Sequence, residues 1–221
     1  MKRFLVFFGL IGCLFLSLLS LTACKSKIDY FAYLSENRSN ILVAEGEDYR
    51  LKIYAVDKEY PYCTDGFIGE VTSRAEIYLS VKNGGDTCRI AFKHDGHDVE
   101  GEMSYDSVTG EYFFSCAANI KEATQLTVDL QHGENKWQTN ALTVKDQNTL
   151  SSKQVLTSLL EKSKSTFDAL TKEKTFEGEI YLRLIYESAP YYYVGITGRD
   201  KKTTAFLIDA VSGNILATKQ N

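Results

Sequence analysis

Hydrophobic and polar residues alternate in short runs over most of this chain. Eight such runs cover residues 41–44, 49–56, 75–81, 88–92, 99–105, 112–116, 126–130 and 137–144. Turn-forming sequences such as Asn83-Gly84 and Asp95-Gly96 separate them. Because a period of two places alternate side chains on opposite faces of a strand, the pattern predicts an antiparallel β-sandwich over residues 41–147.

The pattern changes at residue 148. Ser151 and Gln154 have the spacing of a capping box, and apolar residues then recur at helical spacing from Val155 to Leu170. This predicts an amphipathic helix of about five turns. Alternation returns in four runs after Gly178, over residues 180–186, 191–197, 203–209 and 214–219. A helix followed by an antiparallel meander predicts a small α+β domain over residues 148–221.

The last strands resemble the end of a PepSY domain. The resemblance rests on the run 192–196, the charged turn after it, and the apolar run 205–208, which closes on Asp209-Ala210-Val211-Ser212-Gly213. Asp209 can accept backbone hydrogen bonds across this turn, while Gly213 supplies a positive φ. A cystatin-like unit would give a similar pattern. The resemblance implies a non-catalytic module that restrains or binds partners, as in propeptides of secreted peptidases and in cell-envelope proteins.

The predicted sandwich resembles the immunoglobulin-like modules of bacterial surface proteins. This resemblance lies in the architecture, without a signature motif. A fold of this kind hosts many functions, so it does not identify a ligand.

The N-terminus has the features of a secretory signal. Lys2 and Arg3 precede an apolar run that extends to Leu21, and the run ends in Leu21-Thr22-Ala23-Cys24. This tetrapeptide resembles the lipobox of bacterial lipoproteins, which implies acylation of the Cys24 thiol and removal of residues 1–23. An uncleaved anchor is the alternative, since a membrane helix needs about 20 apolar residues. We expect a lipidated tether over residues 24–40 and a cell-membrane protein on the extracytoplasmic face.

The charge of the chain excludes one class of partner. The net charge is −4, and it becomes −6 when residues 1–23, which include Lys2 and Arg3 but no acid, are removed. No cluster of basic residues stands free of neighbouring acids, so the electrostatic signature of nucleic-acid binding is missing. The expected partners are the membrane, through the lipid anchor, and a protein or cell-wall polymer.

Cysteines and histidines offer little chemistry. Three cysteines follow Cys24, namely Cys63, Cys88 and Cys116, so they form either one disulfide with a free thiol or buried apolar contacts. Cys88 and His94 could supply a nucleophile and its base, but their spacing is not diagnostic.

One histidine cluster needs a choice between two interpretations. The sequence His94-Asp95-Gly96-His97-Asp98 could bind zinc, but it also has the form of a hairpin turn. A zinc site needs three or four convergent ligands, and no further cluster is visible in the sequence. We therefore expect no metal site and no cofactor.

Aromatic residues are the remaining candidates for binding. Tyr60-Pro61-Tyr62 and Tyr191-Tyr192-Tyr193 lie beside turns, where stacked tyrosines could bind a sugar or a peptide. Alternate rings of a three-tyrosine strand point to opposite faces, so at least one ring should lie in the core. On the preceding strand, alternation places Glu179, Tyr181 and Arg183 on the outer face.

These observations predict a non-catalytic surface lipoprotein of the bacterial cell envelope that acts as a binding module. A regulator of a secreted peptidase, either an inhibitor or a chaperone, is the alternative. A small enzyme is disfavoured, because the sequence contains no Gly-x-Ser-x-Gly or His-Glu-x-x-His motif and no glycine-rich phosphate loop after a strand.

Overall fold

The protein is built mainly of β-strands in the computed structural model, which describes residues 28–60 and 68–221. The first strands are β1 (Leu34–Glu45), β2 (Tyr49–Tyr60), β3 (Glu70–Val81), β4 (Cys88–His94), β5 (His97–Asp106), β6 (Glu111–Cys116), β7 (Gln125–His132) and β8 (Asn135–Thr143). The remaining elements are the 3₁₀ helix η1 (Tyr30–Tyr33), α2 (Ser152–Lys162), α3 (Lys164–Ala169), β9 (Thr171–Lys172), β10 (Thr175–Phe176), β11 (Gly178–Tyr186), β12 (Pro190–Gly198), β13 (Thr203–Asp209) and β14 (Ile215–Gln220). The mainly β, largely antiparallel character predicted from the sequence is confirmed. The predicted signal peptide and Cys24 lie outside the described residues.

Eight strands close into a barrel. They follow the order β1-β2-β3-β6-β5-β4-β7-β8, and β8 pairs back onto β1 through Leu42 with Thr143 and Val43 with Leu142. The immunoglobulin-like sandwich predicted over residues 41–147 is corrected by this closure. The strands form one ring instead of two facing sheets, because the first and last strands of the ring pair with each other.

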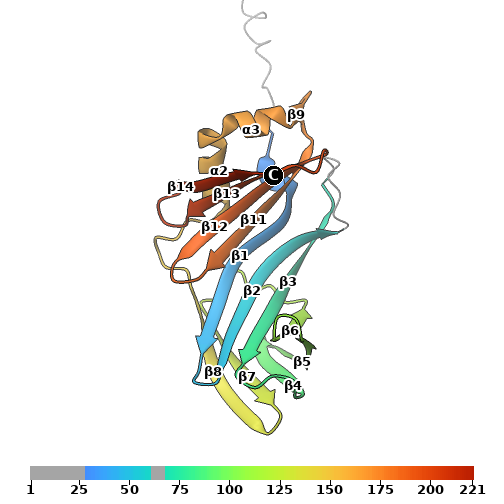
Figure 1. The fold of residues 1–221 in the computed structure, drawn as a ribbon, viewed down its shortest axis with the longest axis vertical. Coiled ribbons are helices and arrows are strands. Elements are labelled where there is room, and N and C mark those ends of the chain that lie inside the picture. The colour runs from blue at the N-terminus through green and yellow to red at the C-terminus, as the bar shows by residue number, and fades with distance from the viewer. Residues whose placement is uncertain (1–27, 61–67) are drawn as a thin grey trace, which may run out of the picture.

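A β-bulge in β1 lets this strand pair with β11 in its first half and with β8 in its second half. Before the bulge at residues 38–40, β1 pairs in parallel with β11, and after the bulge it pairs with β8. Asn40 fixes the bend, since its Nδ2 donates to the carbonyls of Ile120 and Ala123 at 3.3 and 2.8 Å. Its Oδ1 accepts a 2.6 Å hydrogen bond from the Thr143 hydroxyl on β8. β1 thereby joins the barrel to a second sheet, β14-β13-β12-β11-β1 (Figure 1).

Alternate side chains fill the barrel. On β7, the residues Leu126, Val128, Leu130 and His132 are buried and those between them are exposed. Gly101 leaves room for Phe114, because a Cβ at this glycine would lie 2.2 Å from the Phe114 ring. The barrel interior is therefore a packed core.

Two helices cover one face of the second sheet (Figure 1). Val155, Leu156 and Leu159 of α2 share one core with Phe167 of α3 and with alternate residues of β11, β12 and β13. These sheet residues are Ile180, Leu182, Leu184, Tyr192, Val194, Ile196, Phe206 and Ile208. The helix packing thus follows the period of two that the sequence displays in these strands.

The predicted helix is present but divided. Ser151 caps α2 in the predicted capping box with Gln154. At Ser163 the backbone leaves the helical region, with φ −131° and ψ 36°, so α2 ends and α3 begins. After the break, Phe167 packs against Tyr30 of η1, with the two ring centroids 5.1 Å apart.

Two predicted turns are confirmed. Asp95 and Gly96 both have positive φ, 49° and 78°, as the hairpin between β4 and β5 requires. In the last turn, Asp209 Oδ1 accepts from the backbone N–H groups of Val211 and Ser212 at 3.1 and 2.6 Å. Gly213 has φ 67° there.

The N-terminal segment departs from its predicted role. Residues 28–40, expected to belong to a lipidated tether, form η1 and the first half of β1. Leu34, Glu36 and Asn37 are buried, and Asn37 accepts a 2.8 Å hydrogen bond from the Ser152 hydroxyl of α2. The polar composition of this segment misled the prediction, because Glu36 has a partner in the second sheet and Asn37 has one in α2.

Candidate functional site

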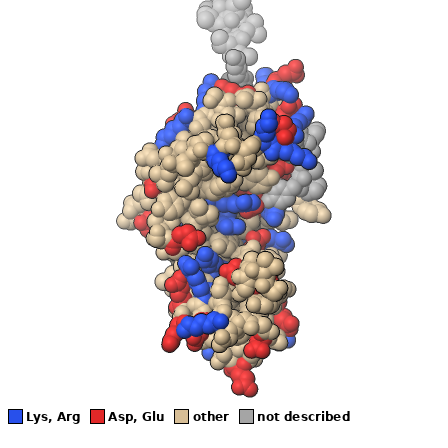
Figure 2. Space-filling view, viewed as in Figure 1, with Lys and Arg blue, Asp and Glu red and all other residues tan. Residues whose placement is uncertain are grey.

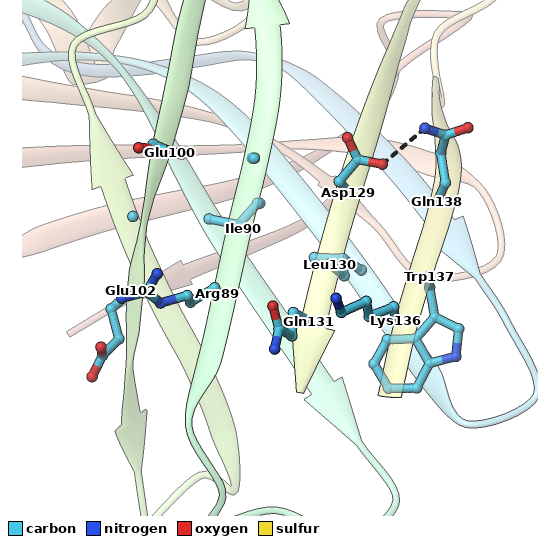
Figure 3. A pocket seen from close by; sticks show the side chains of 12 residues that line it. Arg89, Ile90, Glu100, Glu102, Asp129, Leu130, Gln131, Lys136, Trp137 and Gln138 are labelled. Atoms are coloured by element: carbon cyan, nitrogen blue, oxygen red, sulfur yellow. Dashed lines mark hydrogen bonds between the residues drawn. The ribbon is translucent and has the colours of Figure 1, made fainter. Parts of the chain in front are cut away.

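A hollow of about 690 Å³ lies on the outer face of the barrel, over β5, β4, β7 and β8 (Figure 3). Its lining carries the cations Arg89 and Lys136 and the carboxylates of Glu100, Glu102 and Asp129. All five residues are exposed. Binding sites for small ligands commonly have volumes of about 300–1,000 Å³.

Strand register arranges the polar groups of the hollow in rows. Arg89 pairs with Glu102 on one side and with Gln131 on the other, and Gln131 pairs with Lys136. In the next row, Gln138 donates a 2.8 Å hydrogen bond to Asp129. Because neighbouring strands lie about 4.8 Å apart, the hollow presents donors and acceptors at short, regular intervals.

Trp137 marks the edge of this hollow on β8, but its ring belongs to the inner face of the barrel. It is the cross-strand partner of the buried Leu130, and its ring packs against Tyr49 with the centroids 5.2 Å apart. Figure 3 shows Trp137 on the side of the hollow away from Arg89 and Glu102. The neighbouring residues Lys136 and Gln138 point to the opposite, outer face, so the hollow presents mainly polar side chains.

A second polar cluster lies on the face of the second sheet opposite the helices. Arg183 donates through Nε and Nη2 to both carboxylate oxygens of Glu36, each at 2.7 Å. The guanidinium carbon of Arg183 also lies 5.5 Å from the Tyr181 ring centroid and 6.0 Å from that of Tyr193. These residues line a cavity of about 580 Å³. Bidentate pairing and flanking rings hold the arginine in one orientation.

The predicted outer-face residues show a mixed outcome. Tyr181 and Arg183 do lie opposite the buried residues Ile180 and Leu182. Glu179, however, is only 5% exposed and accepts a hydrogen bond from the Tyr181 hydroxyl. Burial raises the pKa of Tyr181, and the adjacent Glu179 carboxylate raises it further. Glu179 therefore supports Tyr181 instead of facing a ligand.

The predicted histidine cluster is a hairpin. His94 and His97 are cross-strand partners, and Nε2 of His94 forms a 2.7 Å hydrogen bond with the Asn119 carbonyl. Within residues 28–60 and 68–221, no group of three His, Cys, Asp or Glu side chains could hold a metal ion.

The cysteines do not form a nucleophilic pair with His94. Cys88 and His94 are the two ends of β4, and six residues of strand span about 20 Å. Cys88 and Cys116 are free thiols, and Cys63 lies outside the described residues. Burial raises the pKa of the Cys88 thiol to about 11, which makes it a poor nucleophile at neutral pH.

The three-tyrosine strand behaves as predicted. Tyr192 is fully buried and donates a 2.8 Å hydrogen bond to the Leu150 carbonyl. Tyr191 and Tyr193 are less buried and alternate with it along β12, so the prediction of at least one core ring is confirmed. In the other aromatic cluster, Tyr60 is 79% exposed, while Pro61 and Tyr62 lie outside the described residues.

Sequence reasoning missed the hollow over the barrel. Its only local signal is the alternation in residues 125–132, where Asp129 and Gln131 fall on the polar face. The hollow also needs β4 between β5 and β7 and needs β8 beside β7. Adjacent placement of strands that are distant in the sequence is not visible in the pattern of any one strand.

Comparisons with known proteins do not identify a family or a function. No protein-family model, curated protein or solved structure matches the chain. In the described part of the chain, none of the helices has the length and apolarity needed to cross a membrane.

Proposed function

We propose that this protein is a non-catalytic binding module of the bacterial cell envelope, and that the hollow over β5, β4, β7 and β8 holds a cell-wall glycan. The observation that carries the proposal is the rows of charged and amide side chains on the outer face in that hollow. A polysaccharide presents closely spaced hydroxyls, and Arg89, Asp129 and Gln131 match these hydroxyls as donors and acceptors.

The mixture of charges favours a polar, weakly charged ligand. Two cations and three carboxylates share the lining, so the hollow has no strong field of one sign. On the face shown in Figure 2, acidic and basic side chains are likewise interspersed. Charge steering therefore contributes little, and recognition depends on short-range hydrogen bonds.

The hypothesis that the protein is a lipoprotein fits a cell-wall glycan as the ligand. Under it, acyl chains on Cys24 would hold the protein at the outer surface of the cell membrane, four residues before Ile28. η1 lies beside α3 at one end of the molecule, whereas the β7–β8 hairpin lies at the opposite end (Figure 1). An anchor at Cys24 would thus leave the barrel and its hollow directed toward the wall.

A second candidate function is restraint of a secreted peptidase. The PepSY-like resemblance suggests it, and the cluster of Tyr181, Arg183 and Tyr193 favours it. Aromatic and arginine side chains are the residues most enriched in protein–protein hot spots. Under this hypothesis, Tyr193→Ala would abolish inhibition of a secreted peptidase from the same cell, whereas Arg89→Ala would leave it intact.

Sedimentation with purified peptidoglycan sacculi tests the glycan proposal. The full chain in detergent should co-sediment with sacculi, and soluble peptidoglycan fragments should compete with this binding. Arg89→Ala should weaken binding at least about tenfold, which corresponds to about 1.4 kcal/mol.

The matched control is Lys93→Ala. Lys93 is an exposed residue on the same strand as Arg89, and it does not belong to the lining of the hollow. It should bind sacculi like the wild type. Equal binding by Arg89→Ala and Lys93→Ala, or no binding by the wild type, would contradict the proposal.

Metabolic labelling tests the anchor separately. Wild-type protein should incorporate a clickable fatty acid, and Cys24→Ala should not, because the thiol is the acceptor. Label in the mutant equal to that in the wild type would exclude lipidation at Cys24. This result would leave the sedimentation result unaffected.

A further inference from the structure

Two sulfur atoms and an imidazole meet inside one mouth of the barrel. Cys88 of β4 is the cross-strand partner of Met103 on β5 and of His132 on β7. All three residues are buried, with exposed fractions of 0%, 4% and 4%. The Cys88 Sγ and Met103 Sδ atoms lie 3.6 Å apart. Side chains of directly opposed strand residues have Cβ atoms about 5 Å apart, so His132 lies next to Cys88 on the inner face.

Tyr112 orients the imidazole. Its hydroxyl lies 2.8 Å from the Asp86 carbonyl, 2.7 Å from the Gly85 N–H and 2.9 Å from His132 Nε2. A carbonyl only accepts, so the single phenolic proton is donated to Asp86, and the hydroxyl oxygen accepts from the other two groups. In this arrangement Nε2 of His132 carries a proton and donates it to the Tyr112 oxygen.

Metal-binding histidines are usually held in this way. The non-ligating ring N–H donates to a neighbouring group, which fixes the tautomer and the ring orientation. The Tyr112 hydroxyl performs this role for His132. The imidazole, the thiol and the thioether together form a ligand set with two soft sulfur donors.

We propose that Cys88, Met103 and His132 bind monovalent copper. Thioether and thiolate sulfur favour Cu(I), whereas zinc prefers thiolate, imidazole and carboxylate. Cys88 loses its thiol proton to solvent as the copper–sulfur bond forms, and no electron is transferred. The proposal is independent of the glycan proposal, since the two sites use different residues.

A cavity of about 380 Å³ lies at this mouth of the barrel, and Gly85, Met103 and Tyr112 form part of its lining.

Competition with a chromophoric Cu(I) chelator under anaerobic conditions tests the proposal. The full chain carrying Cys63→Ser and Cys116→Ser should still bind one Cu(I), because the proposed ligands are Cys88, Met103 and His132 and the two changes only remove competing thiols. Adding Cys88→Ser should abolish this binding. Tyr112→Phe, which removes only the partner of His132, should weaken it about 10- to 100-fold.

X-ray absorption of the Cu(I) complex supplies a second readout. The spectrum should show two sulfur neighbours and one nitrogen neighbour. Met103→Leu, which nearly preserves the side-chain volume, should reduce the sulfur count to one. Binding by the Cys88→Ser protein as tight as in its parent, or an unchanged sulfur count in Met103→Leu, would overturn the proposal.

Discussion

The barrel and the second sheet differ in where their buried polar groups lie. In the barrel, Cys88, Met103, His132 and Tyr112 face inward. In the second sheet, the layer beneath α2 and α3 is aliphatic and aromatic, and the ion pair of Glu36 with Arg183 lies on the opposite face. A closed ring can shield a small ligand inside it. A sheet covered by helices on one side has only its other side left for polar contacts.

β1 is the element that both regions share. Leu42 belongs to the core of the barrel, whereas its neighbour Ile41 belongs to the core under the helices. Both side chains are buried and similar in size, with exposed fractions of 0% and 1%. The two residues therefore form a matched pair that can perturb one region at a time.

Truncation of this pair should produce the largest effects. Leu42→Ala and Ile41→Ala should each lower the free energy of unfolding by about 2–5 kcal/mol, because each leaves a cavity in a packed core. Native-state hydrogen exchange should show that Leu42→Ala mainly loosens β4 and β7, and that Ile41→Ala mainly loosens β11 and β12. Uniform loss of protection in both variants would show that the two regions unfold as one unit.

A buried tyrosine distinguishes the two regions at high pH. Burial raises the pKa of Tyr192 to about 12, against an ordinary value of 10.0. The folded state therefore keeps the phenolic proton that the unfolded state loses. The resulting stability is fully present below pH 10 and is lost as pH rises to 12, with a total of about 3 kcal/mol.

Tyr192→Phe should remove this part of the alkaline loss. Urea unfolding at pH 9 and pH 11.5 should show a smaller drop for the variant than for the wild type. The control is Tyr112→Phe in the barrel, where burial also raises the pKa but a hydrogen bond from the Gly85 N–H opposes the shift. Equal drops for wild type and Tyr192→Phe would mean that Tyr192 does not titrate in this range.

Local features of the fold could be predicted from the sequence. The capping box of Ser151 and Gln154, the Asp95-Gly96 hairpin and the Asp209 turn depend on contacts within a few residues. The strands were also predictable, because each displays its own alternation. These features carry no information about which distant strands become neighbours.

The closure of the barrel could not be predicted, because it depends on the bulge in β1. In the sequence, Asn40 looks like an ordinary polar residue. Its side chain, however, forms hydrogen bonds with Ile120, Ala123 and Thr143, and these direct β1 toward β8. The same limit applies to both candidate sites. The hollow needs β4 beside β7, and the sulfur cluster needs Met103 and His132 on either side of Cys88.

The smallest expected effect concerns the helices, which only the second region has. Ser151→Ala should lower the free energy of unfolding by about 1 kcal/mol, because the change removes the side-chain oxygen that accepts the Gln154 N–H at the start of α2. Ser163→Ala is the matched control, since Ser163 precedes α3 but makes no side-chain cap hydrogen bond, and its thermal midpoint should stay close to that of the wild type. Hydrogen exchange should place the loss in α2 and leave the barrel amides unchanged, because the barrel closes without the helices. Equal destabilisation by the two changes would mean that the capping box does not hold α2 on the sheet.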